Sequence, residues 1–221
     1  MKKLFSLFLL LGLVAAAQAQ MPEKFVKAME SKVILLDSTT TAEGYIELAN
    51  TFERIANAEK TQWLPYYYAA LCHVMAGYFS MGDNPMGGNA DKIDPVADKA
   101  KALLDKAEEL EKDNSEIYLL RKMVFSLHMM GNPMQRYMTD GQAATAAIEK
   151  AKQLNPDNPR VYLQEAQDKY YTPEQFGGSK TEAKRLLEKS YKQFEIFKPA
   201  SSIHPNWGRG QLQYFMKLVN Q

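Results

Sequence analysis

A pair of small residues seven positions apart occurs four times along this chain, and an aromatic residue follows each pair about 11 to 17 positions later. The pairs are Ala49 and Ala56, Ala100 and Ala107, Ala144 and Ala151, and Ala183 and Ser190, followed by Tyr67, Tyr118, Tyr162 and Trp207. Seven residues is close to two helical turns, so each pair forms a small stripe that a neighbouring helix can approach closely. The repeat predicts helix pairs that stack and present a binding surface.

Apolar residues recur at helical spacing through the rest of the chain, and no alternating stretch is long enough to predict a strand. The expected helices cover residues 23–36, 42–59, 63–79, 95–111, 115–130, 140–154, 159–171, 180–197 and 206–219. Asp94-Pro95 reads as an N-cap followed by proline at the first helical position. The predicted fold class is all-α.

Residues 1–19 have the pattern of a cleavable export signal. Lys2 and Lys3 precede an apolar run, and Ala17-Gln18-Ala19 is a small-x-small cleavage site. The apolar run is shorter than the roughly 20 residues of a membrane-spanning helix. No cysteine follows the cleavage site for lipid attachment. We therefore expect one mature domain over residues 20–221, in the periplasm or secreted, without stable insertion in a membrane.

The mature chain is close to electrically neutral. Without Lys2 and Lys3, 25 basic side chains face 26 acidic ones, which gives no electrostatic reason to expect a nucleic-acid partner. Cys72 is the only cysteine, so an intrachain disulfide is impossible and packing must stabilise the exported protein.

The segment from Lys150 to Tyr162 resembles the junction between tetratricopeptide (TPR) repeats. The two small positions of that pattern correspond to Ala144 and Ala151, the large residue between them to Ile148, and the proline that closes the repeat to Pro156. The small pairs are offset by 51, 44 and 39 residues where the family uses 34, so the units carry insertions, and Lys122 replaces a small residue. The resemblance implies an α-solenoid of about four helix pairs with a C-terminal capping helix.

The resemblance also implies a concave groove that binds a protein or peptide partner, which is our first functional prediction. In the family register the groove is lined by Tyr68, Cys72, Met75, Leu119, Met123, Leu127, Gln164, Gln167, Tyr170 and Tyr171. The alternative is that the first or last helix fills the groove, which would leave these residues as core.

The insertions form a second candidate surface, a loop edge. Two of them share a tripeptide, Asn84-Pro85-Met86 and Asn132-Pro133-Met134, and the third contains Phe176. Loops on a rigid scaffold often carry function. The competing interpretation is a turn whose methionine or phenylalanine folds back onto the core.

The sequence offers no catalytic or cofactor motif, and we predict a non-enzymatic protein without metal or cofactor. His73, His128 and His204 are too far apart for a zinc pattern. Five methionines lie near His128, namely Met123, Met129, Met130, Met134 and Met138, a composition that suits Cu(I) but equally suits core packing. The alternative function is therefore a soluble periplasmic carrier of a small apolar ligand or of a soft metal such as Cu(I), held by a methionine and tyrosine lining.

Overall fold

The computed structural model describes residues 21–82 and 89–220, and this part of the chain is all-α, without a strand. The helices are α1 (Glu23–Val33), α2 (Ala42–Glu59), α3 (Trp63–Ser80), α4 (Ala90–Leu110), α5 (Ser115–Gly131), α6 (Pro133–Arg136), α7 (Gln142–Leu154), α8 (Pro159–Tyr171), α9 (Lys180–Ile196) and α10 (Arg209–Leu218). A π-helical turn, Tyr137–Gly141, joins α6 to α7. The predicted signal segment 1–19 and the tripeptide Asn84-Pro85-Met86 lie outside the described residues.

Polar caps fix where several helices begin. The Thr41 hydroxyl accepts a hydrogen bond from the Gly44 amide at 3.0 Å, which starts α2. Asn158 caps α8 in the same way, with Pro159 at its first position, and Ser179 caps α9. These caps explain why the bounds of α2 and α8 agree with the sequence prediction.

The start of α4 corrects the sequence prediction. The helix begins at Ala90 and is capped by Asn89, so Pro95 lies inside the helix and not at its first position. The carboxylate of Asp94, which we expected to be the cap, accepts two hydrogen bonds from the guanidinium of Arg136. Proline removes one backbone hydrogen bond, and the remaining backbone hydrogen bonds of this long helix keep it continuous at Pro95.

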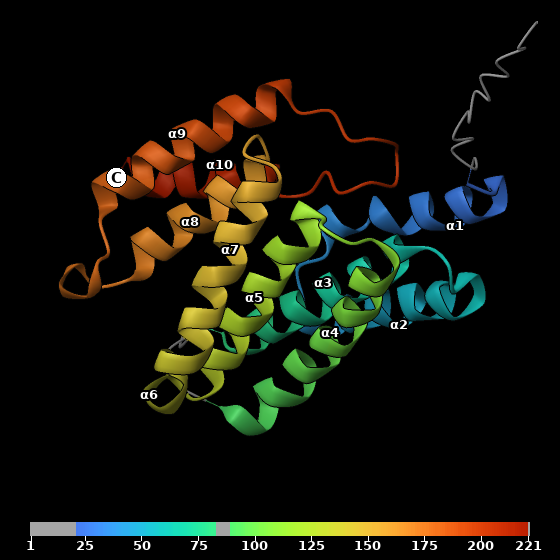
Figure 1. Cartoon of the computed structure of the whole chain (residues 1–221), viewed down its shortest axis with the longest axis horizontal. Helices are drawn as coiled ribbons and strands as arrows, with labels where there is room; N and C mark the ends of the chain where they lie inside the picture. The colour runs from blue at the N-terminus through green and yellow to red at the C-terminus, as the bar shows by residue number, and fades with distance from the viewer. Residues whose placement is uncertain (1–20, 83–88, 221) are drawn as a thin grey trace, which may run out of the picture.

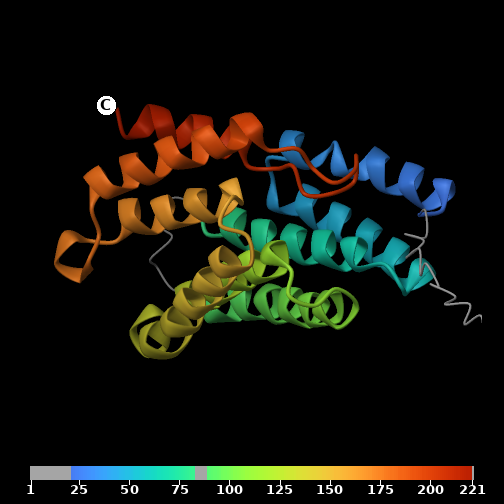
Figure 2. The same ribbon diagram turned by 45° about the horizontal axis from the view of Figure 1, so that its top comes forward.

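The four small pairs are buried, with at most 6% of any of these residues exposed, as their spacing predicts. The apolar side chains divide into two clusters. The larger cluster covers α1 to α5 with part of α7 and Val161 of α8, and it includes Ile203 and Trp207 from the segment between α9 and α10. The smaller cluster lies within α8, α9 and α10. In Figures 1 and 2 these three helices form a group of their own, and α8 runs at an angle to α7.

Arg160 joins the two clusters. Its side chain is 1% exposed and donates hydrogen bonds to both carboxylate oxygens of Glu116, at 2.6 to 3.1 Å. The guanidinium lies over the ring of Phe197, 4.6 Å from its centroid. Burial alone would lower the pKa of Arg160, but the charge of Glu116 outweighs burial and holds the pKa above its usual value. The ion pair therefore stays charged inside the protein.

The segment 197–208, which we call the strap, crosses from the C-terminal helices to the N-terminal ones (Figures 1 and 2). The Tyr68 hydroxyl donates to the carbonyl of Ile203 at 2.9 Å, and the Trp207 indole donates to the Tyr67 hydroxyl at 2.8 Å. The strap thus covers one side of α3. In the described ranges, none of the helices is both long and apolar enough to cross a bilayer.

Candidate ligand-binding site

The predicted groove is closed over most of its length. Six of its ten residues are at most 3% exposed, namely Tyr68, Cys72, Leu119, Met123, Leu127 and Gln164. This corrects the expectation of an open concave surface. Two contacts account for this: the strap lies on Tyr68 of α3, and α5 packs against α3, where the Tyr78 hydroxyl donates to the Met123 carbonyl and Leu127 lies against Gly77. Part of the predicted groove is therefore filled, by a loop and not by the first or last helix of the alternative. Met75 and Gln167 are partly buried.

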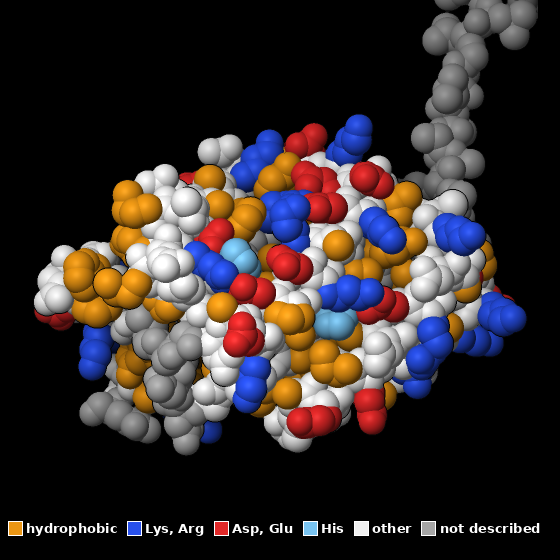
Figure 3. Space-filling model, turned by 90° about the horizontal axis from the view of Figure 1, so that it is seen from below, with side chains coloured by type: hydrophobic (Ala, Val, Ile, Leu, Met, Phe, Trp, Pro, Cys, Tyr) orange, Lys and Arg blue, Asp and Glu red, His pale blue; other side chains and the backbone are white. Residues whose placement is uncertain are grey.

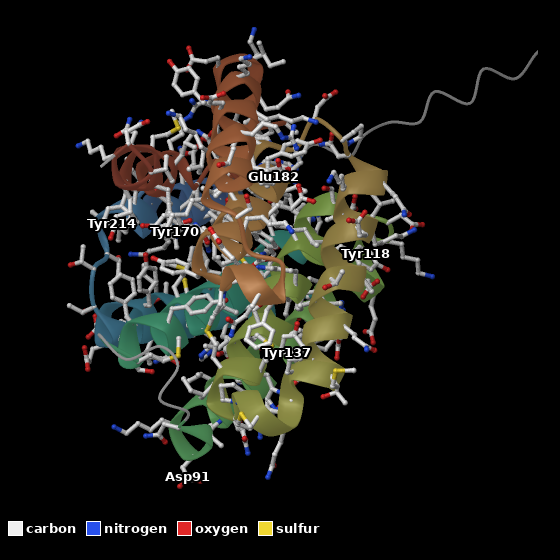
Figure 4. The ribbon with its side chains drawn as sticks, turned by 90° about the vertical axis from the view of Figure 1, so that its left-hand side faces the viewer. Asp91, Tyr118, Tyr137, Tyr170, Glu182 and Tyr214 are labelled. Atoms are coloured by element: carbon white, nitrogen blue, oxygen red, sulfur yellow. The ribbon has the colours of Figure 1, made fainter. Side chains whose placement is uncertain are left out.

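The two remaining groove residues, Tyr170 and Tyr171, belong to an exposed aromatic cluster. Together with Tyr214 and Phe215 of α10 they place four rings within reach of one another, with centroid distances of 5.2 to 6.2 Å. The side chains of Tyr171 and Tyr214 remain 64% and 59% exposed, whereas Phe215 is buried beneath them. Figure 4 views the molecule from this end and shows Tyr170 and Tyr214 close together.

The local sequence explains why these rings meet. Tyr170 and Tyr171 are the last residues of α8, and α10 packs antiparallel to α9 so that its second half reaches the same end of the molecule (Figure 1). Adjacent residues of a helix point about 100° apart, so Phe215 is directed inward while Tyr214 stays at the surface. Figure 3 shows hydrophobic side chains at this end, and others scattered among acidic and basic groups over the rest of that face.

The tyrosine hydroxyls of the cluster influence one another. Partial burial raises the pKa of Tyr171, and the neighbouring Tyr214 and Tyr170 raise it further. The Lys180 ammonium group lies 5.6 Å from the centroid of the Tyr170 ring. The cluster thus offers flat apolar faces, oxygen donors and a nearby cation.

The predicted loop edge does not form one site in the described part of the chain. Met134 is 95% exposed and Phe176 is 64% exposed, so neither folds back as a core plug. Met134 is in α6, where Asn132 and Pro133 begin the turn, while Phe176 lies in the loop after α8. Asn132 donates to Gln135, which is a local turn contact and nothing more.

His128 lies between carboxylates, and the methionines near it in sequence have different surroundings in the described part of the chain. His128 Nδ1 lies 2.7 Å from Asp140 Oδ2, and its Nε2 lies 3.8 Å from Asp94 Oδ1, so carboxylates flank both ring nitrogens. Met123 is core, while Met138 is 65% exposed. Within the described ranges no three His, Cys, Asp or Glu side chains are placed to hold a metal.

Two hollows also open on the surface of the described residues. One, of about 370 Å³, has a mostly acidic lining, formed by Asp105, Glu108, Glu109, Lys112, Asp113 and Tyr118. The other, of about 630 Å³, runs along α10 beside Tyr191 and Leu212. It offers one aromatic ring where the cluster at the end of α8 offers four.

Fold and site together define an all-α protein with an exposed aromatic surface, a class suited to hold a flat apolar molecule. The solved structure of the "HusA haemophore from Porphyromonas gingivalis" is similar to this chain at 35% sequence identity and a TM-score of 0.76. The match covers 88% of this chain and 92% of the other. The chain therefore belongs to the HusA haemophore family. No protein-family model and no curated protein sequence matches it.

This likeness overturns our first functional prediction. The related protein is described as a haemophore, a carrier of haem, so the predicted protein-binding scaffold and its protein or peptide partner are wrong. Our alternative, a carrier of a small apolar ligand, is the better reading of the sequence. The misleading signal was the TPR-like register, which predicted an open groove at positions that are mostly buried.

Proposed function

We propose that this protein binds haem at the aromatic cluster of Tyr170, Tyr171, Tyr214 and Phe215 and carries it without catalysing a reaction. The observation that carries the proposal is the likeness to the HusA haemophore, at 35% identity over 92% of that chain, combined with two exposed tyrosines on one apolar surface. Stacking on aromatic rings suits a porphyrin plane, since each ring pair contributes about 0.5–1.5 kcal/mol beyond burial.

The available donor atoms favour tyrosine as the iron ligand. Haem iron is held in proteins by histidine, cysteine, methionine or tyrosine. Cys72 and His73 are buried, both nitrogens of His128 face carboxylates, and His204 belongs to the strap, where its Nδ1 lies 2.7 Å from the Ser201 hydroxyl. The hydroxyls of Tyr171 and Tyr214 are accessible, and a bound metal ion would favour the deprotonated form of either one despite the raised pKa of Tyr171.

A haemin titration of the purified protein, followed by absorbance in the Soret region and by tyrosine fluorescence, tests the proposal. We expect saturable binding that weakens about tenfold or more, at least 1.4 kcal/mol, in the variant carrying Tyr171→Phe and Tyr214→Phe. Tyr191→Phe, which changes a half-exposed tyrosine beside the other groove, is the matched control and should bind as the wild type does. Absence of saturable binding by the wild type would refute the function, and weakening by Tyr191→Phe alone would refute the site.

Two finer expectations stay as proposals alongside this function. We propose that the helix pairs are divergent TPR-like units, which the burial of all four small pairs supports. We also propose export by cleavage after Ala19, because a haem carrier acts where haem is encountered; mass spectrometry of the mature protein should then give Gln20 as its first residue.

A further inference from the structure

Lys122 is a cation buried between α5 and α8. The residue is 3% exposed, and its ammonium group donates to Asp168 Oδ1 at 2.7 Å and to Gln164 Oε1 at 3.4 Å. Burying an ammonium group is unfavourable unless the attraction of its partner offsets the loss of hydration. A buried ion pair of this kind therefore often contributes little to the free energy of unfolding, and stability alone does not explain why it is present. The lysine also occupies a position where the repeat pattern expects a small residue.

The two members of this ion pair differ in their access to water. The Lys122 side chain is 4% exposed, while the Asp168 side chain is 50% exposed. Asp168 is close enough to α3 that its charge adds to the effect of burial in raising the pKa of Tyr78. The carboxylate therefore lies on the solvent side of the pair and the ammonium group on the buried side.

Helix α8 connects the partner of Lys122 with the aromatic cluster. Asp168 and Tyr171 are three residues apart on α8, which places them on one face about 4.5 Å apart along the helix axis. Gln164 belongs to the same stripe, one turn before Asp168. A haem molecule over Tyr171 would thus have an edge near the ion pair, and haem has two carboxylates on one edge.

We infer that Lys122 binds a carboxylate of the ligand, and that Asp168 occupies this position when the ligand is absent. The inference rests on the proposed haem-binding function. It makes Asp168 a competitor of the ligand, and it makes Lys122 the residue that selects acidic porphyrins over neutral ones.

The test compares haemin with haemin dimethyl ester, which lacks both acids, as ligands of the full chain. We expect Asp168→Asn to tighten haemin binding several-fold and leave ester binding unchanged, because a neutral amide competes less for the ammonium group. Lys122→Met should weaken haemin binding about tenfold without affecting the ester, and Lys122→Arg should restore most of the affinity.

Lys152→Met is the matched control. Lys152 of α7 also pairs with α8, through Glu165 at 2.6 Å, and its loss should not change the preference for haemin over the ester. If Asp168→Asn weakens haemin binding, or if Lys122→Met weakens both ligands equally, the pair is a structural link between helices and the inference is wrong. Saturable binding of both ligands with equal affinity by the wild type overturns the inference but leaves the proposed function standing, whereas binding of neither ligand overturns the function itself. Should Lys122→Met fail to fold, as judged by circular dichroism, Asp168→Asn decides alone.

Discussion

Removing the charge of Arg160 should destabilise this protein more than most single substitutions. Arg160→Met keeps much of the side-chain volume but leaves the carboxylate of Glu116, whose side chain is 13% exposed, without its cation. Breaking a buried pair from one side costs about 3–5 kcal/mol. For a chain of this size each kcal/mol lowers the melting temperature by roughly 2–4 °C, so we expect a fall of roughly 6–20 °C.

Urea unfolding followed by circular dichroism gives the free energy of unfolding directly. The double variant Arg160→Met with Glu116→Leu should regain a large part of the loss, because no buried charge then remains unpaired. Arg185→Met, which removes an exposed arginine paired with Glu182, is the control and should leave the urea midpoint unchanged. A loss below about 1 kcal/mol for Arg160→Met, or no recovery in the double variant, would show that the pair does not connect the two clusters as argued.

Three further predictions concern packing, pH and reactivity. Gly77→Ala should lower the free energy of unfolding, measured in urea, by about 1 kcal/mol or more, because the new methyl group would lie 2.5 Å from a carbon of the fully buried Leu127. Gly210→Ala has open space around it and should instead stabilise α10 by about 0.5–1 kcal/mol. Burial lowers the pKa of His204, so this imidazole binds a proton more readily in the unfolded chain than in the folded one. The free energy of unfolding should therefore fall as pH drops below 6.5. His204→Gln should reduce this dependence when thermal melts at about pH 5 and about pH 8 are compared. Cys72 is fully buried, and burial raises the pKa of its thiol. A thiol reagent, followed by absorbance, should therefore react with Cys72 only at the rate at which the protein opens. Rapid labelling of the native protein would contradict the buried position of Cys72.

The sequence was a good guide to elements whose signals are local. The bounds of α2 and α8 follow from Thr41, Asn158 and Pro159, and the buried stripes follow from alanine spacing, since caps and periodicity act within a few residues. The start of α4 was misplaced because the bond between Asp94 and Arg136, 42 residues apart in sequence, uses the carboxylate that would have been its cap.

The candidate site was only partly predictable, since it depends on contacts between distant segments. The repeat register brought Tyr170 and Tyr171 to attention, but nothing near them in the sequence indicates Tyr214 as a neighbour. Lys122 departs from the repeat pattern, but the sequence does not indicate its partner Asp168, which lies 46 residues further along. The burial of Arg160 could not be predicted from the sequence, because an arginine that follows a helix cap usually faces water.

The strap has a consequence for how the chain matures. The Tyr68 hydroxyl bonds to Ile203, 135 positions further along the chain, and the Tyr67 hydroxyl bonds to Trp207, 140 positions further along. Contacts so remote in sequence slow folding, and one side of α3 stays uncovered until the strap has been synthesised. A nascent chain halted before the strap would therefore expose the aromatic residues of α3 to chaperones and proteases.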